Sequence, residues 1–130
     1  QDPSSPYSSV ISIFTKRIAR GEDITVYGDG TQYRDFIFVK DVVKVNMLAL
    51  EKLDKGFHYY NVGYGKATDI NSLITILQNI YNKTIKVHYV EARLGDIKES
   101  ISDPAKVIRE LGFSPQYSVE EGLTIMADVM

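Results

Sequence analysis

Residues 27–43, with the sequence YGDGTQYRDFIFVKDVV, predict a glycine turn, a strand and a helix start in direct succession. Gly28 and Gly30 can adopt positive φ values without steric cost, so the chain can reverse tightly between them. Residues 34–39 have the aromatic and β-branched composition of a buried strand. The helix expected next is Asp41–Lys52, with its first residue as the cap. This order of elements favours a mixed α/β fold.

Arg34 is the first candidate binding residue, because it stands at the head of the predicted strand beside the glycine turn. The planar guanidinium group of arginine matches the oxygens of a diphosphate better than the ammonium group of lysine does. The competing interpretation is an ion pair across the turn with Asp29 or Asp35. The chemistry of these residues alone favours the ion pair.

Helices and strands alternate along the rest of the chain. Apolar and polar residues predict strands over Ile24–Tyr27, Phe57–Val62 and Thr84–Val90. Periodicity predicts a helix from Val10 that ends at Gly21 and a helix from Thr68 or Asp69 to Tyr81. Capping signals predict a short helix after Asp103-Pro104 that ends at Leu111-Gly112, and a last helix that begins with a capping box of Ser118 and Glu121. With four strands and five helices, we expect one small α/β domain over residues 1–130.

Composition excludes several classes of function. The chain has 130 residues, a net charge of −2 at pH 7 and no cysteine. No basic run exceeds Lys16-Arg17 and no apolar run approaches the roughly 20 residues of a membrane span, so we expect neither a nucleic-acid partner nor a membrane segment. The absence of cysteine excludes disulfides and favours a cytoplasmic location. His58 and His88 have no partners at metal-ligand spacing, so no metal site is predicted.

Short motifs in a fixed order along nearly the whole chain resemble one protein family. Besides residues 27–43, the motifs are QDP at 1–3, YNVGYG at 60–65, RLGD at 93–96, SDPAK at 102–106, LGFSP at 111–115 and VEEGL at 119–123. The chain is thereby similar to the substrate-binding half of nucleotide-sugar epimerases and dehydratases, the extended short-chain dehydrogenases/reductases. The adjacent Gly95 and Asp96 resemble 4-epimerases and some decarboxylases of this family. Residues 1–3, with Pro6-Tyr7 and Val10-Ile11, are most similar to UDP-N-acetylglucosamine and UDP-glucose 4-epimerases.

The resemblance implies that this chain is the C-terminal lobe of such an enzyme and that the Rossmann half is absent. Neither glycine pair completes the dinucleotide fingerprint, because Tyr33 and Thr68 stand where its third glycine belongs. No tyrosine is followed four positions later by lysine, so the family's catalytic Tyr-x-x-x-Lys pair is absent too. We therefore expect NAD and all catalytic residues in a preceding N-terminal domain, and no catalysis by this chain alone. Its start at Gln1 rather than Met fits a piece of a longer protein.

The resemblance also assigns roles to charged residues in this sequence. Arg34 and Arg93 stand at motif positions where the family's arginines bind the diphosphate of the substrate. Asp96, three residues after Arg93, fits an acceptor for a ribose hydroxyl group. The alternative is a surface ion pair between Arg93 and Asp96, which would contribute little to stability.

Further positions match family segments near the nucleotide base and the sugar. Tyr27 matches an aromatic position near the base, although a core aromatic at the sheet edge fits equally well. The backbone at Val10 or Ile11 could pair with the edge of a uracil, and Tyr7 could line the hexose pocket. An ordinary helix start capped by Ser9 is the competing interpretation.

These observations predict the substrate-binding half of an NAD-dependent UDP-sugar 4-epimerase, with a UDP-sugar and its own N-terminal Rossmann domain as partners. Alternatives are a fragment of a UDP-glucuronate decarboxylase or nucleotide-sugar dehydratase, a non-catalytic nucleotide-sugar binding module, and a structural domain with surface arginines. The sequence leaves both the hexose and a homodimer open.

Overall fold

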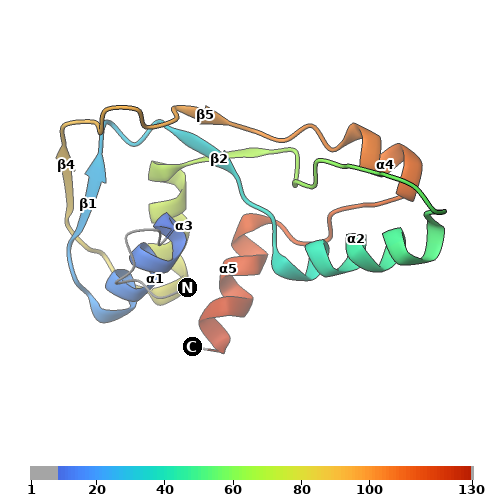
Figure 1. Cartoon of the computed structure of the whole chain (residues 1–130). Coiled ribbons are helices and arrows are strands. Elements are labelled where there is room, and N and C mark those ends of the chain that lie inside the picture. The colour runs from blue at the N-terminus through green and yellow to red at the C-terminus, as the bar shows by residue number, and fades with distance from the viewer. Residues whose placement is uncertain (1–8, 130) are drawn as a thin grey trace.

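The computed structural model describes residues 9–129. Its elements are α1 (Val10–Arg20), β1 (Ile24–Tyr27), β2 (Tyr33–Asp35), α2 (Val39–Lys52), β3 (Ala67–Asp69), α3 (Ile70–Tyr81), β4 (Val87–Val90), β5 (Glu99–Ser100), α4 (Ala105–Leu111) and α5 (Val119–Asp128). The predicted fold class, a small mixed α/β domain with about five helices and short strands, is confirmed (Figure 1). Within these residues no helix has the length and apolar character needed to cross a membrane.

The strands form two small sheets, one of two strands and one of three. β1 and β4 form a parallel pair in which Tyr27 lies opposite Val90. In the second sheet β2 is central, antiparallel to β3 and parallel to β5. Arg34 is paired with Thr68 on one side and with Ser100 on the other. The backbone at Arg34 is therefore held from both sides, which fixes where its side chain leaves the sheet.

The larger core lies between α1, α3, α5 and β1. Its buried residues are Phe14, Ile18, Ile24, Val26, Ile70, Leu73, Ile74, Leu77 and Leu123. Local signals in the sequence set the helix ends as predicted. Gly21 ends α1 with a φ of 72°, and the Asp69 side chain caps α3 by accepting from the Ser72 N–H at 2.8 Å. Ser118 opens α5 with the expected capping box.

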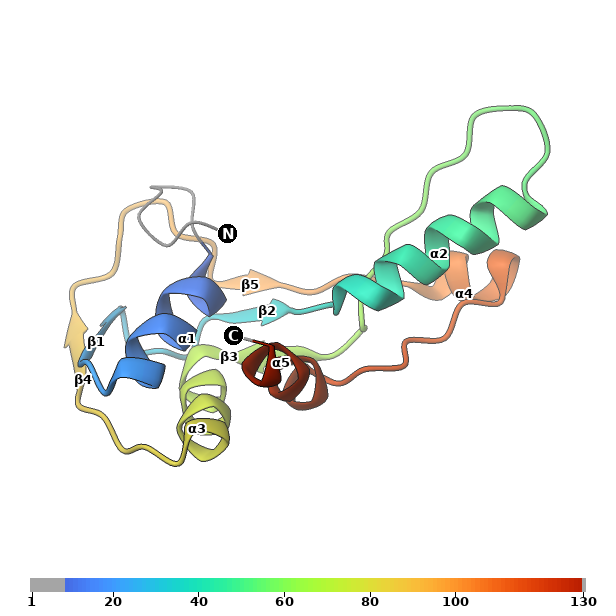
Figure 2. The same cartoon turned by 90° about the horizontal axis from the view of Figure 1, so that it is seen from below.

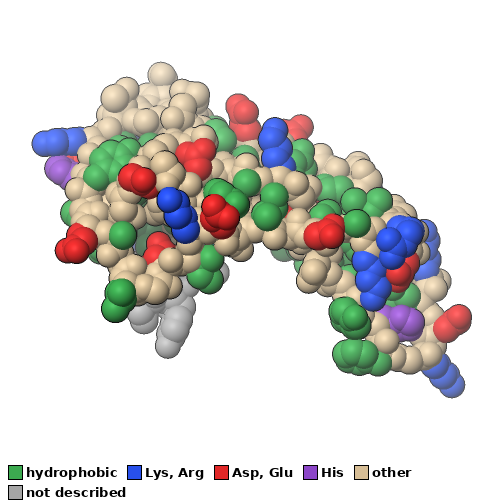
Figure 3. All heavy atoms as spheres, turned by 90° about the horizontal axis from the view of Figure 1, so that it is seen from above, with side chains coloured by type: hydrophobic (Ala, Val, Ile, Leu, Met, Phe, Trp, Pro, Cys, Tyr) green, Lys and Arg blue, Asp and Glu red, His purple; other side chains and the backbone are tan. Residues whose placement is uncertain are grey.

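A second, smaller core lies in an arm, by which we mean α2, residues 53–62, and α4 with the two residues that follow it. Its buried residues are Val45, Val107, Leu111 and Phe113. Figures 1 and 2 show the arm extending away from the body that α1, α3 and α5 form. Lysine and arginine side chains gather on the outer part of the arm (Figure 3).

The strand predicted over residues 34–39 is wrong beyond Asp35, because β2 ends there and α2 already begins at Val39. The apolar residues between them, Phe36, Ile37 and Phe38, are half-buried by side-chain packing instead. Phe38 lies so close to Gly122 of α5 that a Cβ at the glycine would stand 2.9 Å from the Phe38 ring. The apolar composition of residues 36–38 therefore reflects side-chain packing and not the backbone pairing of a strand.

The predicted role of Asp41 as a helix cap is also wrong. Phe38 occupies the N-cap position of α2, and Asp41 lies inside the first turn, fully buried. Its carboxylate accepts from the backbone N–H of Gln116 at 3.0 and 3.1 Å and from that of Tyr117 at 3.2 Å. Asp41 therefore fastens α2 to the loop before α5.

Other strand predictions need correction. Residues 57–62 belong to neither sheet that the described residues form, and β4 begins at Val87 rather than at residue 84. The short strands β3 and β5 were not predicted, because each has only two or three residues and too little alternation to detect. At α4 the carboxylate of Asp103 accepts from the Ala105 N–H at 2.9 Å, although Pro104 occupies the cap position.

Candidate functional site

A cleft of about 710 Å³ opens between α1, the ends of β1 and β2, and the loop after β4. Of the predicted site residues, those that line it are Val10, Tyr27, Arg34, Arg93 and Asp96. Ile11 is not among the lining residues and packs against the larger core instead. Tyr7 lies outside the described residues. Five of the seven positions named from sequence thus lie around a single cleft.

Arg34 reaches into this cleft from the middle of β2. Its Nη2 lies 3.3 Å from the Asp96 Oδ1, and its Nη1 donates to the Tyr33 carbonyl oxygen at 2.8 Å. The predicted ion pair with a neighbouring aspartate is wrong, because both of those carboxylates have other partners. Asp29 accepts from the N–H and hydroxyl of Thr31 at 2.9 and 2.6 Å. These bonds lower the pKa of Asp29.

Asp35 holds together the loops behind the cleft, a role that its place in the sequence does not predict. Its carboxylate accepts from the backbone N–H groups of Tyr64, Gly65 and Ser102 at 3.0, 3.0 and 3.2 Å. Gly63 allows this close approach, because a Cβ there would stand 2.3 Å from the Asp35 Oδ2. The available sign of this role was a glycine-rich loop at residues 63–65, because backbone N–H groups in such a loop need an acceptor and Asp35 can supply one.

Arg93 lies over the ring of Tyr27 at the mouth of the cleft. The guanidinium carbon of Arg93 lies 3.8 Å from the centroid of the Tyr27 ring, a cation–π contact. Tyr27 is 39% exposed, so it is no core aromatic. The described contacts of the Asp96 side chain lead to Arg34 and not to Arg93, whose carbonyl oxygen accepts from the Asp96 N–H at 3.1 Å. The predicted Arg93–Asp96 ion pair is therefore wrong.

Arg17 and Gln32 are among the cleft residues that were not predicted from the sequence. Arg17 lines the cleft from α1 and donates from Nη1 to the Asp23 carbonyl oxygen at 3.1 Å. Gln32 lines it from the turn before β2 and donates from Nε2 to the Tyr27 carbonyl oxygen at 2.8 Å. The spacing of Arg17 seven residues after Val10 puts both on one face of a helix, which was the available signal. Together with Arg34 and Arg93, Arg17 gives the cleft three guanidinium groups and a positive character.

The glycine loop at residues 28–30 does not form a dinucleotide cradle. The glycine loop at residues 28–30 leads from β1 into β2, whereas a dinucleotide cradle leads from a strand into a helix. The loop is also filled from behind: a Cβ at Gly30 would stand 2.1 Å from the Asn71 Oδ1, and the Asn71 Nδ2 donates to the Asp29 carbonyl oxygen. Among residues 9–129 no group of three or more potential metal ligands comes together.

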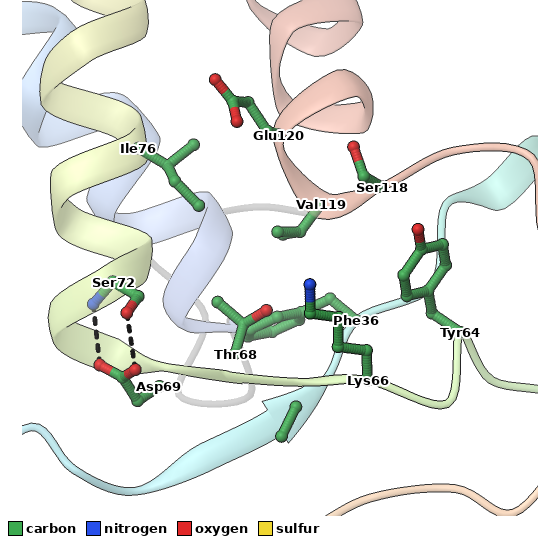
Figure 4. Close-up of a pocket in the computed structure, with 11 residues that line it drawn as sticks. Phe36, Tyr64, Lys66, Thr68, Asp69, Ser72, Ile76, Ser118, Val119 and Glu120 are labelled. Atoms are coloured by element: carbon green, nitrogen blue, oxygen red, sulfur yellow. Dashed lines mark hydrogen bonds between the residues drawn. The ribbon is translucent and has the colours of Figure 1, made fainter.

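A second pocket of about 310 Å³ lies between the start of α3 and the start of α5 (Figure 4). Its polar side chains include Lys66, Asp69, Ser72 and Glu120. The Asp69 carboxylate is already bonded to the hydroxyl and N–H of Ser72 at 2.6 and 2.8 Å. This pocket is therefore built around a helix cap, and the larger cleft is the better candidate for a ligand.

Comparison with known proteins points to one family. Residues 1–63 match the NAD dependent epimerase/dehydratase family. A UDP-glucuronate 4-epimerase of Thermodesulfobacterium geofontis is 35% identical over 111 residues, which are 85% of this chain and 34% of that protein. A putative UDP-glucose 4-epimerase of Methanocaldococcus jannaschii is 32% identical over 123 residues, 95% of this chain and 39% of that protein.

Solved structures show the same relationship. The UDP-glucose 4-epimerase of Thermotoga maritima with UDP-glucose has a TM-score of 0.90 at 39% identity, over 98% of this chain and 40% of that one. The UDP-N-acetylglucosamine 4-epimerase of Methanobrevibacter ruminantium in complex with UDP-N-acetylmuramic acid has a TM-score of 0.87 at 38% identity, over 99% of this chain and 42% of that one. The chain thus spans roughly 40% of the length of these similar proteins.

The fold and the cleft define a small α/β lobe of the epimerase type, with three arginines around one cleft. This chain belongs to the NAD-dependent epimerase/dehydratase family. The resemblance drawn from its sequence motifs is confirmed.

Proposed function

We propose that this chain is the substrate-binding part of an NAD-dependent UDP-sugar 4-epimerase and that its cleft holds the UDP group. The observation that carries the proposal is the meeting of Arg34 and Arg93 at one cleft, from two separate segments of the chain. The activities named for the similar proteins support the substrate class.

The two arginines supply the charge that a diphosphate requires. Each guanidinium group can donate two parallel hydrogen bonds to phosphate oxygens, so two of them can grip both phosphates and orient the sugar beyond them. Arg34 is bonded to Asp96 at 3.3 Å, and both side chains are partly exposed. Such a pair is worth less than about 1 kcal/mol. A phosphate can therefore replace Asp96 as the partner of Arg34 at little cost.

The remaining cleft residues fit the nucleoside. Once Arg34 turns to the diphosphate, the Asp96 carboxylate is left free to accept from a ribose hydroxyl group. Tyr27 and the backbone at Val10 border the same cleft and are the contacts proposed for the base. The side chain of Ile11 packs against the larger core, so only its backbone is proposed to contact the base. Tyr7 lies outside the described residues and is proposed to contact the hexose.

NAD would be bound by the rest of the parent protein, since neither glycine pair completes the dinucleotide fingerprint and the loop at residues 28–30 leads into a strand. In this proposal NAD supplies the hydride chemistry at C4 of the sugar, and the present chain contributes affinity for UDP. Binding energy from the nucleotide, remote from the reacting carbon, retains the substrate while the sugar changes its orientation. The chain by itself is then inactive.

We also propose that the parent protein is cytoplasmic and forms a homodimer. Cell fractionation tests the location, and light scattering on the parent protein tests the dimer.

Titration calorimetry with UDP on the complete parent protein tests this function. We expect Arg34→Ala and Arg93→Ala each to raise the Kd by more than about tenfold, which corresponds to about 1.4 kcal/mol. The matched control is Arg109→Ala, because Arg109 lies on α4, is highly exposed and pairs with its neighbour Glu110. Unchanged UDP affinity in both cleft variants would refute the assignment of the diphosphate.

A further inference from the structure

Arg17 is a charged residue of the cleft to which the proposed function assigns no role. It lines the cleft from α1, and its Nη1 donates to the carbonyl oxygen of Asp23 at 3.1 Å. The carboxylate of Asp23 is not its partner, because that group bonds the Nε2 of His88 at 3.0 Å. Within the described part of the chain Arg17 pairs with no carboxylate, whereas Arg34 pairs with Asp96. Arg17 therefore brings to the cleft a positive charge without an ion-pair partner and N–H donors beyond the one already used.

The free edge of β1 fixes where this guanidinium group lies. The N–H groups of Ile24 and Gly28 donate toward β4, at 3.1 and 2.9 Å. In a trans peptide unit the N–H and the carbonyl oxygen point in opposite directions, so the carbonyl oxygen of Asp23 points to the other edge of the strand. There it accepts from Arg17, and the carbonyl oxygen of Tyr27 likewise accepts from another side chain that lines the cleft. The free edge of β1 is thus a wall of the cleft, and Arg17 is held on its open side.

Arg17 and Arg93 stand at opposite ends of this wall. Arg17 bonds Asp23, just before β1, whereas Arg93 lies over the ring of Tyr27, the last residue of the strand. Four residues of extended chain lead from Asp23 to Tyr27, which is about 13 Å at roughly 3.3 Å per residue. The two phosphates of a diphosphate share an oxygen atom and lie next to each other. A diphosphate held by Arg34 and Arg93 therefore leaves Arg17 for another part of the ligand.

The base is the part of a UDP group that lies farthest from the diphosphate. When the diphosphate is at Arg93 and the nucleoside extends along β1, the base approaches Arg17. The ring nitrogen N1 of a pyrimidine carries the ribose, and C4 lies directly across the ring from N1. The substituent on C4 is therefore the group that extends farthest toward the start of β1. This substituent is an acceptor oxygen in uracil and a donor amino group in cytosine.

We propose that Arg17 determines the base specificity of the cleft by donating to the C4 oxygen of uracil. This inference rests on the proposed function, in which the cleft holds a UDP group. An arginine has N–H donors and no acceptor, so it binds a 4-oxo pyrimidine and rejects a 4-amino one. Its bond to Asp23 restricts the side chain before the ligand arrives, which reduces the entropy lost on binding.

Titration calorimetry on the complete parent protein with UDP and with CDP tests this role. We expect the wild type to bind UDP at least about tenfold more tightly than CDP, because a misplaced donor faces Arg17 in CDP. Arg17→Ala should lower the ratio of the Kd for CDP to the Kd for UDP at least about fivefold, chiefly by weakening UDP binding. The two ligands share their ribose and their diphosphate, so a general loss of charge or of folded protein leaves this ratio unchanged. An unchanged ratio in Arg17→Ala would overturn the proposal, even if both affinities fell.

Arg20→Ala is the matched control. Arg20 also lies in the last turn of α1, pairs with Glu22 and does not line the cleft. Both arginines lie near the negative end of the helix dipole, so the two variants lose the same charge and a similar dipole contact. We expect the ratio of the two Kd values to stay at the wild-type value in Arg20→Ala. An equal fall of the ratio in both variants would contradict a direct contact between Arg17 and the base.

The wild-type titrations separate this inference from the proposed function. Equal affinity for UDP and CDP would overturn the role of Arg17 and leave the binding of the diphosphate supported. UDP binding with a ratio that Arg17→Ala does not change would likewise overturn the role of Arg17 alone. A parent protein that binds neither nucleotide would overturn the proposed function and this inference with it.

Discussion

The guanidinium carbon of Arg93 lies 3.8 Å from the centroid of the Tyr27 ring. This contact joins the end of β1 to the loop that follows β4, and the parallel pairing of Tyr27 with Val90 brings the two together. The ring therefore holds the arginine at the mouth of the cleft before any ligand arrives. Preorganisation of this kind reduces the entropy lost on binding.

Tyr27→Ala should release Arg93 and weaken UDP binding by the parent protein. A cation–π contact at a partly exposed site is worth about 0.5–1 kcal/mol, so we expect the Kd to rise about two- to fivefold. Tyr27→Phe is the control, because it keeps the ring and should keep the affinity. Titration calorimetry measures both variants, and equal losses in the two would show that the hydroxyl group and not the ring carries the effect.

Asp96→Ala should reduce the preference of the cleft for a ribose. Removing a negative charge near the diphosphate favours every UDP analogue alike, so the absolute affinity is a poor readout. The ratio of the Kd for 2′,3′-dideoxy-UDP to the Kd for UDP is free of that effect. We expect this ratio to fall at least about threefold in the variant, since one charge-assisted hydrogen bond is lost.

Stability provides the second readout for Asp96. The pair with Arg34 is partly exposed, so its loss should change the free energy of unfolding by less than about 1 kcal/mol. A ratio that stays the same in a stably folded variant would remove the ribose role from Asp96.

Local signals made α1, α3 and α5 predictable from sequence, because their ends depend on residues next to them in the chain. Gly21, Asp69 and Ser118 each act within one turn of their own helix. The strand predicted over residues 34–39 failed for the opposite reason. Ile37 packs against the smaller core, and Phe38 packs against Gly122 of α5. Because the residues that these two side chains contact are far away in the sequence, a local pattern cannot predict the contacts.

The composition of the cleft was more predictable than its connections. Motif resemblance named Arg34, Arg93 and Asp96, and all three line the cleft. The pairing of Arg34 with Asp96 could not be predicted, because it depends on how β2 lies beside β5. Likewise, the three backbone donors that Asp35 accepts from belong to loops 29 or more residues away. Such long-range contacts depend on the register of the sheet, which no local pattern specifies.

Gly63→Ala should destabilise the protein through steric overlap. A Cβ at this position would stand 2.3 Å from the Asp35 Oδ2 and 2.4 Å from the Ser102 Cβ. Because the carboxylate is held by three backbone N–H groups, it cannot move away freely. Overpacking of this kind costs about 1–3 kcal/mol, which thermal denaturation of the parent protein can measure.

Gly21→Ala is the matched control for this substitution. Gly21 has a φ of 72° and open space around its Cβ position. Its replacement should cost only the left-handed backbone strain, about 1 kcal/mol. The two glycines therefore separate overlap from strain, and a larger loss at Gly21 than at Gly63 would contradict the close packing against Asp35.

Asp69→Ala should destabilise the start of α3 in a manner that depends on pH. The hydroxyl and the N–H of Ser72 donate to the Asp69 carboxylate and lower its pKa below the ordinary value of 3.8. Because the folded pKa lies below the unfolded one, the stabilisation is fully present above pH 3.8 and is lost as the pH falls through the folded value. At pH 7 the loss of the cap should cost about 1 kcal/mol.

Urea denaturation at pH 7 and near pH 3 measures this effect. The free energy of unfolding should differ less between Asp69→Ala and the wild type near pH 3 than at pH 7. Asp54→Ala, at an exposed aspartate in the loop after α2, is the control and should show no difference at either pH. A gap between Asp69→Ala and wild type that stays constant from pH 7 to pH 3 would show that the charge of Asp69 contributes nothing to the cap.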